Sequence, residues 1–153
     1  MEIKIASNID HSLPDNVIEV VIHASENSLE LQKIINSIQS IANHIDTIIG
    51  KNGNEVFIIP IQDIILFYSL EQTIYCKTKK GDFKINRKLY ELEELIDKKQ
   101  FIRISNSCIA NINFIESFDL SYIGNIIVKF KNGDQEYVSK RRIPHVMKFL
   151  KEK

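Results

Sequence analysis

The chain has 153 residues, a formal net charge of zero and 44% apolar residues, which suits one soluble domain with or without a small addition. It has no uncharged apolar run long enough to cross a membrane, and its N-terminus does not resemble a signal peptide, so we expect a cytoplasmic protein. Cys76 and Cys108 are far apart, and the four histidines are scattered. We therefore expect no metal site, no cofactor and reduced, buried cysteines.

The charges are distributed unevenly along the chain. Residues 1–59 carry three basic and eight acidic side chains, whereas residues 60–153 carry 17 basic and 12 acidic ones. A basic C-terminal part beside an acidic N-terminal part is typical of a polyanion-binding domain joined to a segment with another role.

The N-terminal residues predict a small ββα segment. Residues 2–6 and 17–24 are rich in alternating β-branched residues and predict two strands. From Leu31 the apolar residues recur with the spacing of an amphipathic helix over about 28–45, and Asn27 with Glu30 resembles a capping box. We place the domain boundary so that residues 1–48 form this segment and residues 49–153 form a second domain.

The rest of the chain predicts a mainly β (α+β) protein. Asn52-Gly53 is a strong hairpin signal, and a second hairpin turns at Leu70-Glu71-Gln72. An amphipathic pattern predicts a short helix over 88–97, and further alternating runs predict strands up to about residue 139. The chain ends in a short helix with Pro144 in its first turn.

One stretch, FIRISNSCIANINFIESF, interrupts this alternation with Ser105-Asn106-Ser107. Such side chains bind phosphates and base edges well, but they also satisfy the free N–H groups at the start of a helix. The second interpretation predicts that the triplet caps a one-turn helix at 108–111.

Enzyme motifs are missing from the sequence. There is no G-x-S-x-G elbow, no glycine-rich phosphate loop and no carboxylate pair with a reason to be buried together. We therefore expect a protein that is not an enzyme.

From about residue 55 to 151 the chain resembles the LytTR type of bacterial DNA-binding domain. Four blocks in the family's order carry the resemblance: IPIQDIILFYS, GDFKINRKLYELEELI, FIRISNSCIANINFIESF and VKFKNGDQEYVSKRRIPHV. The resemblance implies a transcription regulator with an elongated, antiparallel β fold whose loops enter successive major grooves of double-stranded DNA.

The family also implies which residues contact DNA. Asn106 would contact a base edge or a phosphate, and Ser105 and Ser107 would contact phosphates. Family members place an arginine before the last helix, so we expect the following cations to bind DNA, Arg141 first, although a solvated patch is the alternative: Lys140, Arg141 and Arg142.

Two further segments complete the expected interface. The family inserts the loop over 69–73 into the groove, where this chain offers Glu71, Gln72 and Thr73 in place of the basic residue or histidine of some relatives. Arg87 and Lys88, at the start of the 88–97 helix, would bind phosphate or remain solvated charges.

Many family members carry a receiver domain of roughly 120 residues, and the residues before the LytTR-like part are too few for one. The apolar stripe of the 28–45 helix predicts either a lid on the chain's own β domain or a homodimer contact, of which we favour the homodimer. Regulation would then act through a partner, for which a membrane protein is one candidate. The alternative function is a protein-interaction or small-ligand module on the same β scaffold.

Overall fold

The protein is represented by a computed structural model that describes residues 12–14 and 18–153, without the side chains of residues 40–43. The chain divides into two units, residues 1–36 and 37–153, which are described separately. The predicted strand over 2–6 lies outside the described residues.

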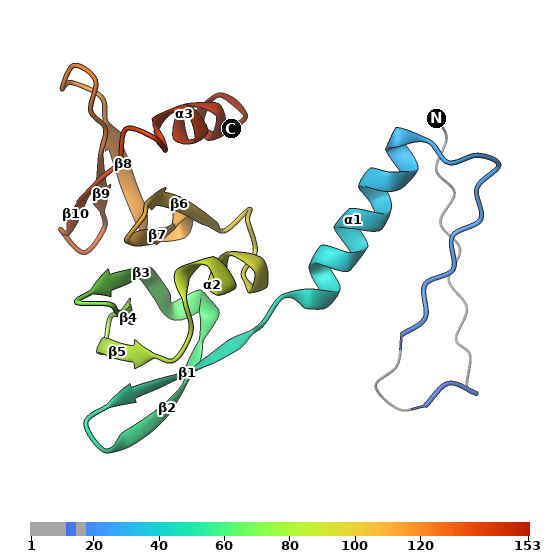
Figure 1. The fold of residues 1–153 in the computed structure, drawn as a ribbon, viewed down its shortest axis with the longest axis horizontal. Helices are drawn as coiled ribbons and strands as arrows, with labels where there is room; N and C mark the ends of the chain where they lie inside the picture. Colours follow the sequence, from blue (N-terminus) through green and yellow to red (C-terminus); the bar gives the residue numbers. More distant parts are fainter. Residues whose placement is uncertain (1–11, 15–17) are drawn as a thin grey trace. The chain divides into compact units, whose positions relative to one another are not determined.

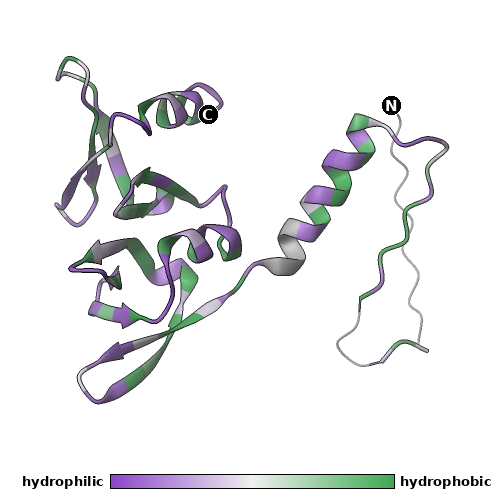
Figure 2. Cartoon of the chain, in the orientation of Figure 1, coloured by the Kyte–Doolittle hydropathy of each residue, from purple (hydrophilic) through white to green (hydrophobic). Residues whose placement is uncertain are grey.

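Helix α1 (Leu29–Asn43) confirms the amphipathic helix predicted near its position. Its apolar side chains at Leu31, Ile34, Ile35 and Ile38 are partly buried, while the polar residues between them are exposed, and Figure 2 shows the two kinds of residue alternating around the helix. The predicted capping box was wrong. The N–H of Leu31 donates to the hydroxyl of Ser28 at 3.1 Å, whereas Asn27 accepts from the side chain of Gln32 at 2.6 Å.

The strand predicted over 17–24 is not formed where the structure describes it. Residues 18–24 have no regular secondary structure, and Ile18 and Val21 are exposed. A β-branched sequence becomes a strand only where a neighbouring strand completes its hydrogen bonds, and no described strand pairs with these residues.

The second unit contains a seven-stranded antiparallel sheet and a three-stranded one, which confirms the mainly β fold (Figure 1). The larger sheet has the order β2-β1-β5-β4-β3-β7-β6. Its strands are β1 (Thr47–Asn52), β2 (Glu55–Pro60), β3 (Ile64–Leu70), β4 (Thr73–Thr78), β5 (Gly81–Ile85), β6 (Phe101–Ser105) and β7 (Cys108–Asn111).

The smaller sheet has the order β10-β9-β8 (Figure 1). Helix α2 packs against the larger sheet, and helix α3 packs with residues of both sheets. The remaining elements are β8 (Ile115–Asp119), β9 (Ile127–Phe130), β10 (Gln135–Tyr137), α2 (Leu89–Leu95), α3 (Ile143–Lys151) and the short 3-10 helices η1 (Ile61–Asp63) and η2 (Ile112–Phe114). Both sheets are antiparallel throughout.

Both faces are buried at the central strands β3 and β7 of the larger sheet. On one face, α2 packs through Leu92 onto Phe67 and its neighbours. On the other face, Leu66 and Ile104 pack with residues of the smaller sheet and of α3, including Val128. Strand β3 contributes Ile64 and Phe67 to one core and Ile65 and Leu66 to the other, with a register shift between Ile64 and Leu66. Its sequence IILF is therefore continuously apolar.

Three details explain why particular residues hold this fold together. A Cβ at Gly50 would lie 2.7 Å from the Cβ of Phe83, which cannot move without its backbone, so this buried position favours glycine. Asn111, fully buried, donates to the carbonyl of Ile64 at 2.7 Å and joins β7 to the start of β3. Cys76 and Cys108 are buried and unbridged, as predicted.

Candidate nucleic-acid interface

The structure brings the predicted DNA-binding segments to one end of the seven-stranded sheet. The β3–β4 and β6–β7 turns lie at this end because the strands alternate in direction and β3 pairs with β7. The backbone N–H of Ser69 donates to the carbonyl of Ser107 at 2.8 Å, which fixes one turn against the other. Residues separated by more than 30 positions in the sequence therefore form one surface.

The β3–β4 turn is a two-residue hairpin in which Leu70 pairs with Thr73. Its central residues, Glu71 and Gln72, have φ angles of 48° and 65°. Positive φ at both central positions is the type I′ geometry that matches the twist of paired strands, but glycine and asparagine adopt it more easily than Glu or Gln. The turn exposes both side chains, and Thr73 is partly buried.

The β6–β7 turn contains the Ser105-Asn106-Ser107 triplet. Residues 108–111 form strand β7, so the alternative in which the triplet caps a helix there was wrong. The hydroxyl of Ser105 instead accepts from the backbone N–H of Ser107 at 3.2 Å and lies 3.2 Å from the hydroxyl of Ser107. Asn106 is exposed at the tip of the turn. Its side chain has no hydrogen bond to the described part of the chain.

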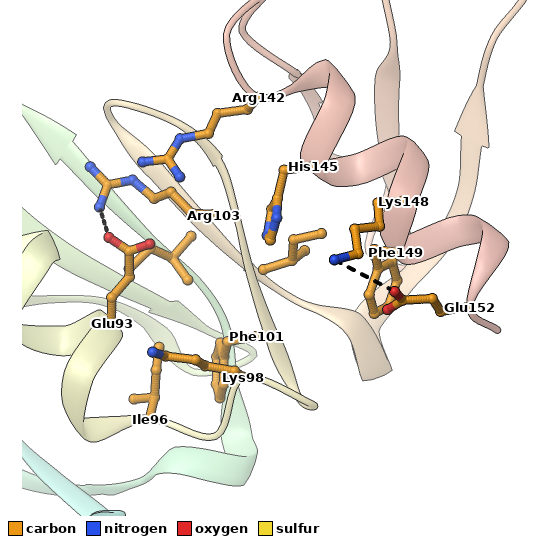
Figure 3. Close-up of a pocket in the computed structure, with 12 residues that line it drawn as sticks. Glu93, Ile96, Lys98, Phe101, Arg103, Arg142, His145, Lys148, Phe149 and Glu152 are labelled. Carbon is orange, nitrogen blue, oxygen red and sulfur yellow. Dashed lines mark hydrogen bonds and ion pairs between the residues drawn. The ribbon is translucent and has the colours of Figure 1, made fainter. Parts of the chain in front are cut away.

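The cations Lys140, Arg141 and Arg142, here called the basic cluster, follow β10 and lead into α3. The backbone N–H of Ser139 donates to the carbonyl of Ile104 at 2.9 Å, which attaches the start of the cluster to β6 one residue before the triplet. Lys140 and Arg141 are exposed. Arg142 is partly buried and lines a pocket with Arg103 (Figure 3).

Arg87 and Lys88 lie at the same end of the sheet as the two turns. Ile85, the last residue of β5, pairs with Ile74, which follows Thr73 in β4. Both cations are exposed, and the backbone N–H of Lys88 donates to the carboxylate of Glu91 at 2.7 Å, which caps the first turn of α2. All four predicted segments thus share one end of the second unit.

An ion pair joins strand β4 of the larger sheet to the β9–β10 turn of the smaller sheet. The ammonium of Lys77 on β4 donates to the carboxylate of Asp134, before β10, at 2.8 Å. This bond raises the pKa of Lys77 and lowers the pKa of Asp134. Nearby, burial raises the pKa of the Glu136 carboxyl, and the positive charge of Lys77 offsets part of this rise.

Arg103, on β6 two residues before the triplet, was not among the residues predicted from the sequence. Its guanidinium donates to Glu93 of α2 and to two carbonyl oxygens of the β6–β7 turn. In the sequence, the alternation of apolar and polar residues identifies Arg103 only as a polar residue of a strand. The partner carboxylate is ten positions away, and only the packing of α2 against the sheet shows that they meet.

Comparisons with known proteins identify the family and the fold of this chain. The family model described as the LytTr DNA-binding domain matches residues 54–151. The chain belongs to that family. A solved LytTr DNA-binding domain from Bacillus cereus has the same fold, with a TM-score of 0.67 and 21% identity over 69% of this chain and 97% of that one. The family resemblance and the fold class inferred from the sequence are therefore confirmed.

Longer relatives extend the likeness beyond the LytTr domain. Two proteins named uncharacterized HTH-type transcriptional regulators, from Staphylococcus aureus strains NCTC 8325 and COL, are each 33% identical over 129 residues. These alignments cover 84% of this chain and 86% of each relative. In the described part of this LytTr chain, strands separate every pair of helices, so no helix-turn-helix is formed there.

The described residues offer neither a metal-binding cluster nor a membrane-spanning helix. No group of three or more metal-ligating side chains occurs in the described ranges. Among the helices of that same part of the chain, none is long and apolar enough to cross a membrane.

Proposed function

We propose that this LytTr protein is a transcription regulator that binds double-stranded DNA in a sequence-specific way through the end of its larger sheet. The observation that carries the proposal is the convergence of both hairpin turns and the basic cluster, joined by the Ser69–Ser107 and Ser139–Ile104 hydrogen bonds. The names of the relatives and of the family support a regulator that acts on DNA, and hence in the cytoplasm.

The chemistry of this surface supports separate roles for its residues. The exposed amide of Asn106 both donates and accepts, as reading a base edge requires. The cations of the basic cluster, with Arg87 and Lys88, neutralise phosphates and position the domain. Glu71, Gln72 and Thr73 enter the major groove from the β3–β4 turn, and Ser105 and Ser107 contact phosphates.

The strain of the β3–β4 turn is consistent with a role for its side chains. Asn-Gly in this turn would satisfy the same φ angles without the steric cost that Glu71 and Gln72 carry. Non-glycine residues with positive φ concentrate at functional sites, where the side chain compensates for the strain. We propose that these two side chains supply part of the base contacts.

We further propose that the protein is a homodimer that reads two half-sites in successive major grooves. The partly buried stripe of α1 is the candidate contact between copies, because an amphipathic helix gains stability by burying its apolar face. Two half-sites about 10 base pairs apart would place equivalent surfaces on the same side of the duplex.

A second function is favoured by one specific feature, an apolar face on the β1–β2 hairpin. Ile49, Val56 and Ile58 are 52%, 62% and 72% exposed, and β2 is an edge strand. Contiguous exposed apolar residues mark surfaces that bind other proteins. A protein-interaction module without DNA binding is therefore the competing proposal.

Selection of bound sequences from a random pool of double-stranded DNA distinguishes the two. We expect enrichment of a defined sequence, with two similar half-sites if the protein acts as a dimer. The enriched duplex should then bind at physiological salt at least about a thousandfold more tightly than a scrambled duplex of the same length. Recovery of an unenriched pool, with equal binding of both duplexes, would reject the DNA-binding function and favour the interaction module.

A further inference from the structure

We infer that Arg103 is a positioning residue for DNA recognition, which holds the β6–β7 turn so that Asn106 is presented in one geometry. The inference rests on the proposed function. In the β6–β7 turn, Ser105 pairs with Cys108, so the loop between the two strands has only two residues.

A two-residue hairpin loop normally needs positive φ angles to follow the twist of its strands. The β3–β4 turn meets this requirement, but neither Asn106 nor Ser107 has a positive φ. The pairing of β6 with β7 also shifts register between Arg103 and Ser105, which is typical of a β-bulge. The turn therefore departs from the usual two-residue hairpin geometry, and side-chain contacts add to the Ser69–Ser107 backbone hydrogen bond in holding it.

Arg103 supplies these side-chain contacts. Its Nε donates to the carbonyl of Ser105 at 2.5 Å, and one Nη donates to the carbonyl of Asn106 at 2.6 Å. The other Nη donates to the carboxylate of Glu93 at 2.7 Å, drawn as a dashed line in Figure 3. Glu93 lies on α2, whose buried residues pack against the sheet. The guanidinium thus connects the tip of the turn to a helix fixed in the core.

The same contacts separate Arg103 from the cations that bind phosphate. Its side chain is only 10% exposed, and each of its three nitrogens already donates to a protein oxygen. The planar fork of arginine makes three such bonds at once, whereas a lysine ammonium on a flexible stem cannot reproduce that pattern. Arg103 therefore acts on DNA through the position of Asn106 and not by direct contact.

The test is the variant Arg103→Lys, which keeps the charge and loses the fork. We expect specific DNA affinity to fall about tenfold or more, as it does when a base-contacting group is lost or misplaced. Non-specific affinity, and the slope of log affinity against log salt, should stay at wild-type values because no phosphate contact is removed. Lys99→Gln is the control, since it alters an exposed cation at the opposite end of β6 and should bind like wild type.

A second readout follows the turn without DNA. Backbone amide exchange should become faster in Arg103→Lys at Ser107 and at Ser69, whose N–H donates to the turn, while exchange at Phe67 in the core stays slow. Faster exchange throughout the domain would indicate loss of stability and not a local role. In that case Glu93→Gln decides, because it weakens the anchor and leaves the two carbonyl contacts in place.

Each outcome has a defined meaning. A loosened turn with reduced specific binding, in Arg103→Lys or in Glu93→Gln, supports the inference. Wild-type specific affinity despite a loosened turn overturns it, and so does an equal fall of specific and non-specific affinity, which would make Arg103 a phosphate contact. A wild-type protein with no sequence preference would reject the proposed function, while the exchange measurement would still report whether Arg103 holds the turn.

Discussion

Substitution of Asn106 by alanine tests the proposed base-reading role of this residue separately from the fold. The side chain is exposed and makes no hydrogen bond to the described part of the chain, so its removal costs no internal contact there. Surface changes of this kind alter stability by less than about 0.5 kcal/mol, so the Tm should move by less than about 2 °C.

The effect on binding should be much larger. Loss of a good base contact costs roughly 1–3 kcal/mol, or about 5- to 150-fold in specific affinity, because each 1.4 kcal/mol corresponds to a factor of ten. The loss should fall mainly on one or two positions of the selected site, and competition among single-base variants of that site would locate them. The scrambled duplex should bind as before.

Asn54→Ala provides a matched control, because Asn54 is an exposed asparagine in the β1–β2 turn at the other end of the sheet. It should leave both affinities unchanged. The reasoning is wrong if Asn106→Ala lowers the Tm by several degrees and leaves specific affinity intact, since the side chain would then serve the fold. Equal weakening of specific and scrambled duplexes would make Asn106 a phosphate contact instead.

Three further predictions concern salt, assembly and pH. Specific affinity should fall steeply with salt, because the basic cluster releases counterions from the phosphates it neutralises. Removing Arg141 should reduce the slope of log affinity against log salt by about one. A flat salt dependence would contradict this interface. Ile34→Glu with Ile38→Glu should convert a dimer into a folded monomer that binds one half-site weakly, and a wild-type chain that sediments as a monomer at micromolar concentration would refute the dimer. Glu136→Gln should stabilise the protein at neutral pH by less than about 1 kcal/mol, because the raised pKa shows that the partly buried charge is unfavourable and solvent screens part of the cost. The folded carboxyl takes up its proton at higher pH than the unfolded one, so the wild type gains stability as the pH falls through the raised pKa, and the difference between the thermal midpoints of the two proteins should shrink over that range.

Local signals predicted the elements that depend on local chemistry. The Asn52-Gly53 hairpin, the 88–97 helix and the final helix with Pro144 all formed near their predicted positions, because turn geometry and apolar periodicity act over a few residues. The predicted capping box failed locally, because the N–H of Leu31 donates to Ser28 and not to Asn27. The other predictions that failed each needed a distant partner. Residues 18–24 have strand propensity without a described strand to pair with, and residues 108–111 form a strand because β3 and β6 lie on either side of them.

The DNA-binding roles of the candidate residues stay predictions, and the sequence indicated only part of their arrangement. Family resemblance identified the segments, but the hydrogen bonds that bring them together connect backbone atoms, which leave no trace in the residue types. Arg103 was missed because its role depends on Glu93 of α2. Strand pairing also defines where the second domain starts. Thr47 and Ile48 already lie in β1 and pair with β2, although the amino-acid composition does not change at these residues.

Because β3 is buried on both faces, the two layers of the LytTr domain should unfold together. Ile64 and Phe67 belong to one core, and Ile65 and Leu66 to the other, so β3 cannot leave one layer and remain in the other. Removal of the small sheet would expose the second set to water and invite aggregation. Unfolding of residues 47–153 should therefore be a single cooperative transition. A truncated chain that ends after β7 would lose the basic cluster and would also fail as an independent folding unit.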